Sequence, residues 1–226
     1  MWWSIVAAAL IGYLIGSVQF GLIIGRITRG IDIRDYGSGA TGATNVIRTS
    51  GAKAGVLVIL LDAGKGVAAA YIGLGLAHLA GVSGTDDRAW AMAAGGLGAV
   101  VGHIWPVFFG FRGGKAVATG AGAALAMNPA ATAALIPIAA LVVLGVRIMS
   151  AMTVAMTILL AIVFIALAAF GVSPWAFAAY AVAGAALIVW KHRGNIGRLL
   201  EGTEPKIGRG GERRAGPTPG DPRPAR

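Results

Sequence analysis

Long apolar runs without charge are the feature that most restricts how this chain can fold. Residues 2–25 contain no charged side chain and would be about 36 Å long as a helix. A run of about 20 such residues can cross a bilayer, and similar runs occur near 54–78, 90–105, 150–170 and 174–190. Only 12% of the residues are charged, about half the share that a soluble domain carries. The sequence therefore predicts an all-α polytopic membrane protein.

The number of spans depends on the stretch from 116 to 147, which forms either one bent span or two shorter ones divided near Asn128 and Pro129. Two segments here give about seven transmembrane helices. The first charge, Arg26, follows the first apolar run, whereas a secretory signal has basic residues ahead of it. We therefore expect the N-terminus outside and the C-terminus in the cytoplasm. Basic residues favour the cytoplasmic side, and the basic loop 26–53 and the basic tail then both lie there.

The net charge of +10 is concentrated at the C-terminus, because nine of the nineteen Lys and Arg residues lie in 191–226. A basic tail beside a membrane attracts anionic lipid headgroups. It lacks interleaved aromatic residues, which argues against nucleic-acid binding. We expect one membrane-embedded domain, 1–208, and a disordered Gly/Pro/Arg-rich tail, 209–226. The chain has no cysteine, which excludes disulfides, and we expect neither a metal nor a cofactor.

The first of three polar segments, RDYGSGATGATNVIR at 34–48, is rich in glycine and lies between two apolar runs. Backbone N–H groups of such a turn can point into one concavity that favours an anion. A helix that begins near Thr44 would add its positive end, and Ser38 and Asn45 would add side-chain donors. A flexible connector is the alternative interpretation, because loops are commonly rich in glycine.

The second polar segment, GHIWPVFFGFRGGKAVAT, covers 102–119. Gly113 and Gly114 place the cation of Lys115 next to backbone that a ligand can approach closely. The spacing differs from the GxxxxGK[ST] of a nucleotide-binding P-loop, so nucleotide binding is unsupported. His103, at the end of a span, is either an acid or base or a hydrogen-bonded structural histidine.

The third polar segment, KHRGNIGRLLEGTEPKIG, covers 191–208 and follows the last span directly. On a helix, His192 and Asn195 are three residues apart and share a face. A basic anchor at the membrane interface would explain Arg193 and Arg198, but it would leave Asn195 and Glu204 without a role.

Asp62 and Lys65 are ionisable residues inside the second apolar run, three positions apart. Such residues are costly at membrane depth, and they usually face a protein interior or a wet cavity. A structural ion pair and a role in a site both fit this spacing.

Together, GSGATGATN with Arg48, GHIWPVFFGFRGGKAVAT and HRGNIGRLLEGTE resemble the three signature segments of one bacterial family. This family is the acyl-phosphate-dependent glycerol-3-phosphate acyltransferases of the PlsY type, and the resemblance covers roughly residues 10–208. It implies transfer of a fatty acyl group from acyl phosphate to the 1-hydroxyl of glycerol 3-phosphate, which gives lysophosphatidic acid and phosphate. It also implies an inner-membrane protein with seven spans and motifs that face the cytoplasm.

The resemblance assigns expected roles residue by residue. Residues expected near the reacting groups, with catalytic roles, are His103, Lys115, His192 and Asn195. Residues expected to bind substrate are Ser38, Gly39, Thr44, Asn45, Arg48, Gly113, Gly114, Arg193 and Glu204. Asp62 and Lys65 are expected to support the site from behind.

The sequence departs from the family pattern at three positions. Ala40 stands where the family commonly has asparagine, Ala116 where it has glycine, and Gln19 where it often has proline. None of the three is a charged residue of the motifs. The His-x4-Asp signature of other glycerolipid acyltransferases is absent, so we expect no His–Asp dyad. Either His103 or His192 assists removal of the hydroxyl proton, or a substrate phosphate does.

A phosphate or organophosphate transporter is the alternative function, since it would also need basic residues and interrupted spans. Such a protein would explain Asp62 and Lys65 better. It would, however, bind near the midplane between inverted repeats. The polar segments here are expected on one side, which favours the acyltransferase.

Overall fold

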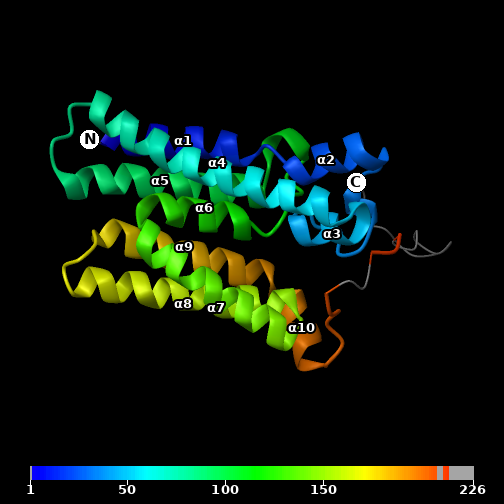
Figure 1. Ribbon diagram of the computed structural model, residues 1–226. Coiled ribbons are helices and arrows are strands. Elements are labelled where there is room, and N and C mark those ends of the chain that lie inside the picture. The colour runs from blue at the N-terminus through cyan, green and yellow to red at the C-terminus, as the bar shows by residue number, and fades with distance from the viewer. Residues whose placement is uncertain (1, 208–210, 214–226) are drawn as a thin grey trace.

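The computed structural model describes residues 2–207 and 211–213, and within these ranges the chain is built from helices (Figure 1). The α-helices are α1 (Trp2–Gly16), α2 (Phe20–Arg29), α3 (Ala43–Ser50), α4 (Ala52–Leu79), α5 (Thr85–Ile104), α6 (Val117–Met127), α7 (Pro129–Val146), α8 (Met149–Ala169), α9 (Trp175–Lys191) and α10 (Arg193–Leu200). Two short 3-10 helices are η1 (Ile33–Asp35) and η2 (Val107–Phe109).

Five helical segments of the described chain are long and apolar enough to cross a membrane. They are 2–29, 52–79, 85–109, 129–146 and 149–169. The helices α6 and α9 are also apolar but shorter. The prediction of an all-helical membrane protein is thus confirmed, while the count of seven spans and the orientation of the termini stay predictions.

The first apolar run is not one continuous helix, as the sequence suggested, but two helices that meet at residues 17–19. The Ser17 hydroxyl donates to the Tyr13 carbonyl at 2.8 Å. The fully buried Gln19 side chain accepts from the Thr41 hydroxyl at 2.5 Å and donates to the His103 carbonyl at 3.3 Å. Side-chain bonds of this kind compete with the helical ladder, and they fix the chain where α1 ends and α2 begins.

The ambiguous stretch from 116 to 147 forms two helices, α6 and α7, divided at Asn128. The Asn128 side chain accepts from the Ala131 backbone N–H at 3.0 Å, and Pro129 is the first residue of α7. An asparagine cap followed by proline is a common helix start, so the local sequence explains the division.

Helix α5 lies at the centre and packs against α1, α4, α6 and α9. Small residues bring these helices close together, because a Cβ at Gly12 would meet the Gly95 carbonyl of α5, and one at Gly73 would meet the Ala91 carbonyl. Small residues allow such close approach between membrane helices.

The polar segments gather at one end of the bundle. Figure 1 shows α2, α3 and α10 at this end, whereas the α4–α5 and α8–α9 connections lie at the opposite end. The tail predicted to be disordered, 209–226, falls outside the described residues except for 211–213. The fold thus brings three segments that are distant in sequence to the same end.

Candidate active site

A cavity of about 730 Å³ lies where the three polar segments meet. Arg48 from α3, Lys115 from the α5–α6 loop and Asn195 from α10 all line it. The complete lining is Gly37, Ser38, Arg48, Lys115, Lys191, Arg193, Gly194, Asn195, Arg198, Glu204, Pro205, Glu212 and Arg213. The structure therefore brings together six of the predicted site residues, namely Ser38, Arg48, Lys115, Arg193, Asn195 and Glu204.

A chain of hydrogen bonds runs from Lys115 to Glu204 along one wall of the cavity. The Lys115 ammonium donates to Asn195 Oδ1 at 2.5 Å, and Asn195 Nδ2 donates to Glu204 Oε1 at 2.5 Å. Glu204 also accepts from the Ser150 hydroxyl at 2.8 Å and from Arg198 Nε at 2.8 Å. Glu204 thus forms an ion pair with Arg198 and accepts the amide N–H of Asn195. Because the amide nitrogen of Asn195 faces Glu204, its oxygen faces Lys115.

The ionisation of this wall follows from burial and charge. Burial lowers the pKa of Lys115, Glu204 opposes this, and the nearby cations Arg198, Arg48 and Lys191 lower it further, to about 8. Burial raises the pKa of Glu204, but hydrogen bonds from Asn195, Ser150 and Arg198 outweigh burial, so the net pKa is lowered. Glu204 is therefore ionised at neutral pH, and Lys115 is mostly charged there but loses its charge as the pH rises through about 8.

Asn45 builds the glycine-rich loop rather than the wall of the cavity. Its buried Nδ2 lies 2.9, 3.1 and 3.0 Å from the carbonyls of Ile33, Tyr36 and Ala40, and its Oδ1 accepts from the Ser38 backbone N–H at 3.1 Å. A single amide in the first turn of α3 thus holds four points of the loop. Ser38 is fixed at the cavity as a result.

The remaining residues of this loop differ in what they contribute. Gly39 has a φ of 69°, a left-handed conformation that turns the chain. Neither Gly39 nor Thr44 lines the cavity. Burial lowers the pKa of Arg48, and its Nε is buried without a hydrogen-bond partner among the described residues. A buried donor without a partner is costly, so Arg48 is suited to receive an anion.

Asp62, Lys65 and His103 form a buried polar cluster behind the cavity. Lys65 Nζ lies 2.8 Å from Asp62 Oδ1, 2.9 Å from His103 Nδ1 and 2.6 Å from the Val18 carbonyl. His103 Nδ1 is also 3.6 Å from Asp62 Oδ1. None of the three lines the cavity, so the structure places them in a position to support the loops.

Gly113 and Gly114 lie directly on His103. The Gly114 N–H donates to the His103 carbonyl at 3.1 Å. A Cβ at Gly113 would meet that carbonyl, and a Cβ at Gly114 would meet His103 Nε2. Because these two residues have no side chain, the loop packs closely against the C-terminal end of α5. This packing positions Lys115, the next residue.

His192 is buried at the junction of α9 and α10 and does not line the cavity. Its Nδ1 lies 2.8 Å from the Ile188 carbonyl, so Nδ1 carries the hydrogen. Burial, and then repulsion from Lys115, lowers the pKa of His192 to about 4. The ring is therefore neutral at neutral pH, with an unprotonated Nε2.

Sequence reasoning missed several residues that line or support the cavity. Arg198, three positions after Asn195, is explained by the sequence only as an interfacial anchor, yet it forms an ion pair with Glu204. Lys191 lines the cavity, and its Nζ lies 5.8 Å from the centroid of the Trp105 ring. Helical spacing from Asn195 could have identified Arg198, whereas nothing in the local sequence of α8 points to Ser150.

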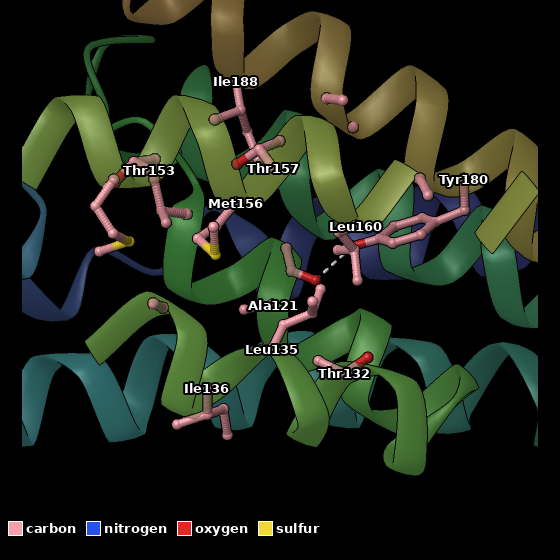
Figure 2. A pocket seen from close by; sticks show the side chains of 17 residues that line it. Ala121, Thr132, Leu135, Ile136, Thr153, Met156, Thr157, Leu160, Tyr180 and Ile188 are labelled. Atoms are coloured by element: carbon pink, nitrogen blue, oxygen red, sulfur yellow. Dashed lines mark hydrogen bonds between the residues drawn. The ribbon is translucent and has the colours of Figure 1, made fainter. Parts of the chain in front are cut away.

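A second, apolar cavity of about 180 Å³, called the apolar groove below, lies between α6, α7, α8 and α9 (Figure 2). Leu135, Met156 and Leu160 are among its lining residues, and the Tyr180 hydroxyl beside it donates to the Gly120 carbonyl at 2.7 Å. Val117 lines its wall only two residues after Lys115. The structure thus places a groove suited to hydrocarbon close to a cavity suited to anions.

Comparisons with known proteins point to one family. The sequence profile described as glycerol-3-phosphate acyltransferase matches residues 6–202. A glycerol-3-phosphate acyltransferase of Gloeobacter violaceus is 41% identical over 196 residues, with 87% of this chain and 91% of the relative covered. One of Shouchella clausii is 40% identical, with 91% and 97% covered.

The fold is also similar to a solved structure. The crystal structure of PlsY (YgiH), an integral membrane glycerol 3-phosphate acyltransferase in its glycerol 3-phosphate form, has a TM-score of 0.78 and 38% identity, and 91% of this chain and 96% of that chain are covered. Its lysophosphatidic acid form has a TM-score of 0.75 and 36% identity, with 90% and 95% covered.

Proposed function

The chain belongs to the glycerol-3-phosphate acyltransferase family, and from this membership we propose that its acyl donor is acyl phosphate. The fatty acyl group passes to the 1-hydroxyl of glycerol 3-phosphate, and the products are lysophosphatidic acid and inorganic phosphate. The observation that carries the proposal is the excess of cations around one cavity, where Lys115, Arg48 and Asn195 meet. Two phosphate-bearing substrates require such a site.

Binding of the phosphates is assigned to the cations and to the glycine-rich loop. Arg48 and Lys115 attract the phosphate oxygens, and Ser38 adds a hydroxyl beside them. Charge-assisted hydrogen bonds of this type are about twice as strong as neutral ones. Arg193, whose guanidinium stacks at 4.5 Å on the Trp190 ring, holds a further positive charge at the rim.

The acyl chain is assigned to the apolar groove between α6 and α9. Val117 is one of its lining residues, and Thr153, Met156 and Tyr180 lie along it (Figure 2). Burying each methylene there contributes about 0.8 kcal/mol. The reactive carbonyl of a chain in this groove comes to lie near Lys115, where the leaving phosphate is stabilised.

The chemistry needs little beyond positioning and charge stabilisation. The 1-hydroxyl oxygen attacks the acyl carbonyl carbon, a C–O ester bond forms, and the C–O bond to phosphate breaks. The proton of the hydroxyl goes to a phosphate oxygen, so an acyl phosphate dianion and an alcohol give an ester and hydrogen phosphate. Lys115 and Arg48 stabilise the phosphate as its charge becomes localised.

A histidine base is not required by this balance, and neither His103 nor His192 lines the cavity. We expect the acidic limb of the pH profile of kcat/KM to report protonation of the substrate phosphate, whose second pKa is about 6. This acidic limb should occur at the same pH in His103→Ala and His192→Ala, even if the maximal rates of these variants are lower. A limb that disappears in either variant would identify that histidine as the base.

We propose further that all seven apolar segments cross the inner membrane, with the N-terminus outside and the cavity facing the cytoplasm. The absence of native cysteine allows single-cysteine reporters. In intact cells a membrane-impermeant thiol reagent should label Ser83→Cys and spare Thr203→Cys until the cells are opened. Labelling of Thr203→Cys in intact cells would contradict the orientation.

The donor is tested with purified protein in detergent, glycerol 3-phosphate and either palmitoyl phosphate or palmitoyl-CoA. We expect lysophosphatidic acid and an equal amount of phosphate from palmitoyl phosphate and no product from the thioester. Product from palmitoyl-CoA alone would refute the proposed donor. Lys115→Ala serves as the inactive control, provided that it stays folded by thermal unfolding.

A further inference from the structure

A short segment near the C-terminus, residues 211–213, lies on the glycine-rich loop beside α3 (Figure 1). The Gly37 backbone N–H donates to the Glu212 carbonyl at 2.9 Å, and Tyr36 and Arg213 form an antiparallel bridge. Both Glu212 and Arg213 line the anion-binding cavity. This segment follows residue 202, where the match to the family profile ends.

Gly211 lets the segment approach the last turn of α3 closely. A Cβ at Gly211 would meet the backbone carbonyl of Arg48. A larger side chain would therefore push the segment away from α3. The segment is thus held at two places, by backbone pairing with residues 36 and 37 and by close approach to Arg48.

Arg213 forms no salt bridge with another residue that the structure describes. Among residues 2–207 and 211–213, no carboxylate lies within 4.0 Å of its guanidinium, and the salt bridges found there involve other residues. The Glu204 carboxylate of the same cavity is already taken up by Arg198, Ser150 and Asn195. Arg213 therefore presents to the cavity a guanidinium that no described carboxylate pairs with, beside the carboxylate of Glu212.

We propose that Arg213 is a substrate-binding residue that contacts a phosphate dianion in the cavity, and that residues 211–213 position it by pairing with the glycine-rich loop. The proposal deepens the proposed function and rests on its assignment of this cavity to the phosphates. The phosphate belongs either to glycerol 3-phosphate or to the acyl donor. In both cases Arg213 strengthens binding, because an arginine matches two phosphate oxygens at once.

The test compares steady-state constants of Arg213→Ala, Arg213→Lys and Arg213→Glu with those of the wild type at low salt, with each substrate varied in turn. We expect the KM for one substrate to rise by about 5- to 20-fold in Arg213→Ala and further in Arg213→Glu, with kcat changed less than about twofold. Arg213→Lys should retain most of the affinity. The substrate whose KM rises identifies the phosphate that Arg213 contacts.

Two further measurements separate binding from general damage. The KM effect of Arg213→Ala should shrink in high salt, since screening acts on an exposed charge. Gly211→Val should raise the same KM, and the double variant with Arg213→Ala should add little to either single change, because both remove one contact. Lys206→Ala removes an exposed cation that does not line this cavity, and it should leave both KM values unchanged.

The proposal is overturned if Arg213→Ala and Arg213→Glu leave both KM values within about twofold of the wild type at low salt. The wild-type rate with palmitoyl phosphate is measured in the same series. A failure of that rate would refute the acyl donor rather than the role of Arg213. Calorimetric titration with glycerol 3-phosphate, which needs no donor, then tests Arg213 separately. A heat and affinity equal to those of the wild type in Arg213→Glu would remove Arg213 from that substrate's site.

Discussion

Replacing Lys115 with arginine should remove the alkaline limit of catalysis in this protein. Burial and neighbouring cations lower the pKa of Lys115 to about 8. In the free enzyme at pH 9 only about one tenth of the molecules then carry the Lys115 charge. Because the phosphates require that charge, kcat/KM of the wild type should fall about tenfold for each pH unit above 8.

The size of the effect follows from the position of the ammonium. A phosphate charge about 4 Å from Lys115, in a partly buried site of effective dielectric constant near 20, is attracted by about 4 kcal/mol. Loss of one such donor from a preorganised site typically costs about 100- to 1,000-fold in rate. We therefore expect Lys115→Ala to lose at least about 100-fold in kcat/KM at pH 7.

The arginine variant separates charge from geometry. Its guanidinium would stay charged at every accessible pH, so Lys115→Arg should show a flat kcat/KM between pH 8 and about 10. Its level should be lower than that of the wild type at pH 7, because a planar guanidinium does not reproduce the 2.5 Å contact of the Lys115 ammonium to Asn195. Initial rates of lysophosphatidic acid formation, measured across this range, give both profiles.

Two results would refute this reasoning. A wild-type profile that is flat from pH 7 to 9.5 would show that the pKa of Lys115 is not lowered, or that its charge is not needed. An alkaline limb that persists unchanged in Lys115→Arg would show that another group titrates. The substrate's own phosphate does not interfere, since its second pKa is about 6.

Three other changes test the packing and the loop. Gly66→Ala should lower the free energy of unfolding by about 1–3 kcal/mol, because its Cβ would meet the Thr119 carbonyl of α6, whereas Gly75→Ala has open space and should be neutral in thermal unfolding. Asn45→Asp should reduce turnover at least about tenfold, because a carboxylate cannot donate to the three loop carbonyls; full activity would contradict this role. Tyr180→Phe should cost about 1 kcal/mol by removing a buried hydrogen bond, and unchanged thermal unfolding would argue against it.

The sequence predicted the membrane class and the clustering of polar segments because both depend on local composition. Apolar runs identify helices regardless of how the helices pack. The motifs around Arg48, Lys115 and Asn195 can be recognised from their residue types alone. The apolar pattern alone does not show that α6 and α7 are separate helices. Asn128 followed by Pro129 does predict a helix start there. Ala116 has a φ of 59°, the left-handed conformation that explains why the family commonly has glycine there.

Other features depend on contacts between distant segments and could not be predicted. The break between α1 and α2 is fixed by Gln19, whose partners lie 22 and 84 residues away. His103 looks like a catalytic histidine in sequence, yet it is buried against Asp62 and Lys65 beneath the loop of Lys115. Periodicity and motif spacing contain no information about such partners.

The most direct test of the central claim is a crystal structure of this protein with glycerol 3-phosphate bound. We expect the phosphate to lie in the cavity lined by Ser38, Arg48, Lys115 and Asn195, within hydrogen-bonding distance of Lys115 and Arg48. A phosphate bound at another face, with the Lys115–Asn195 pair unchanged and out of contact, would contradict the account.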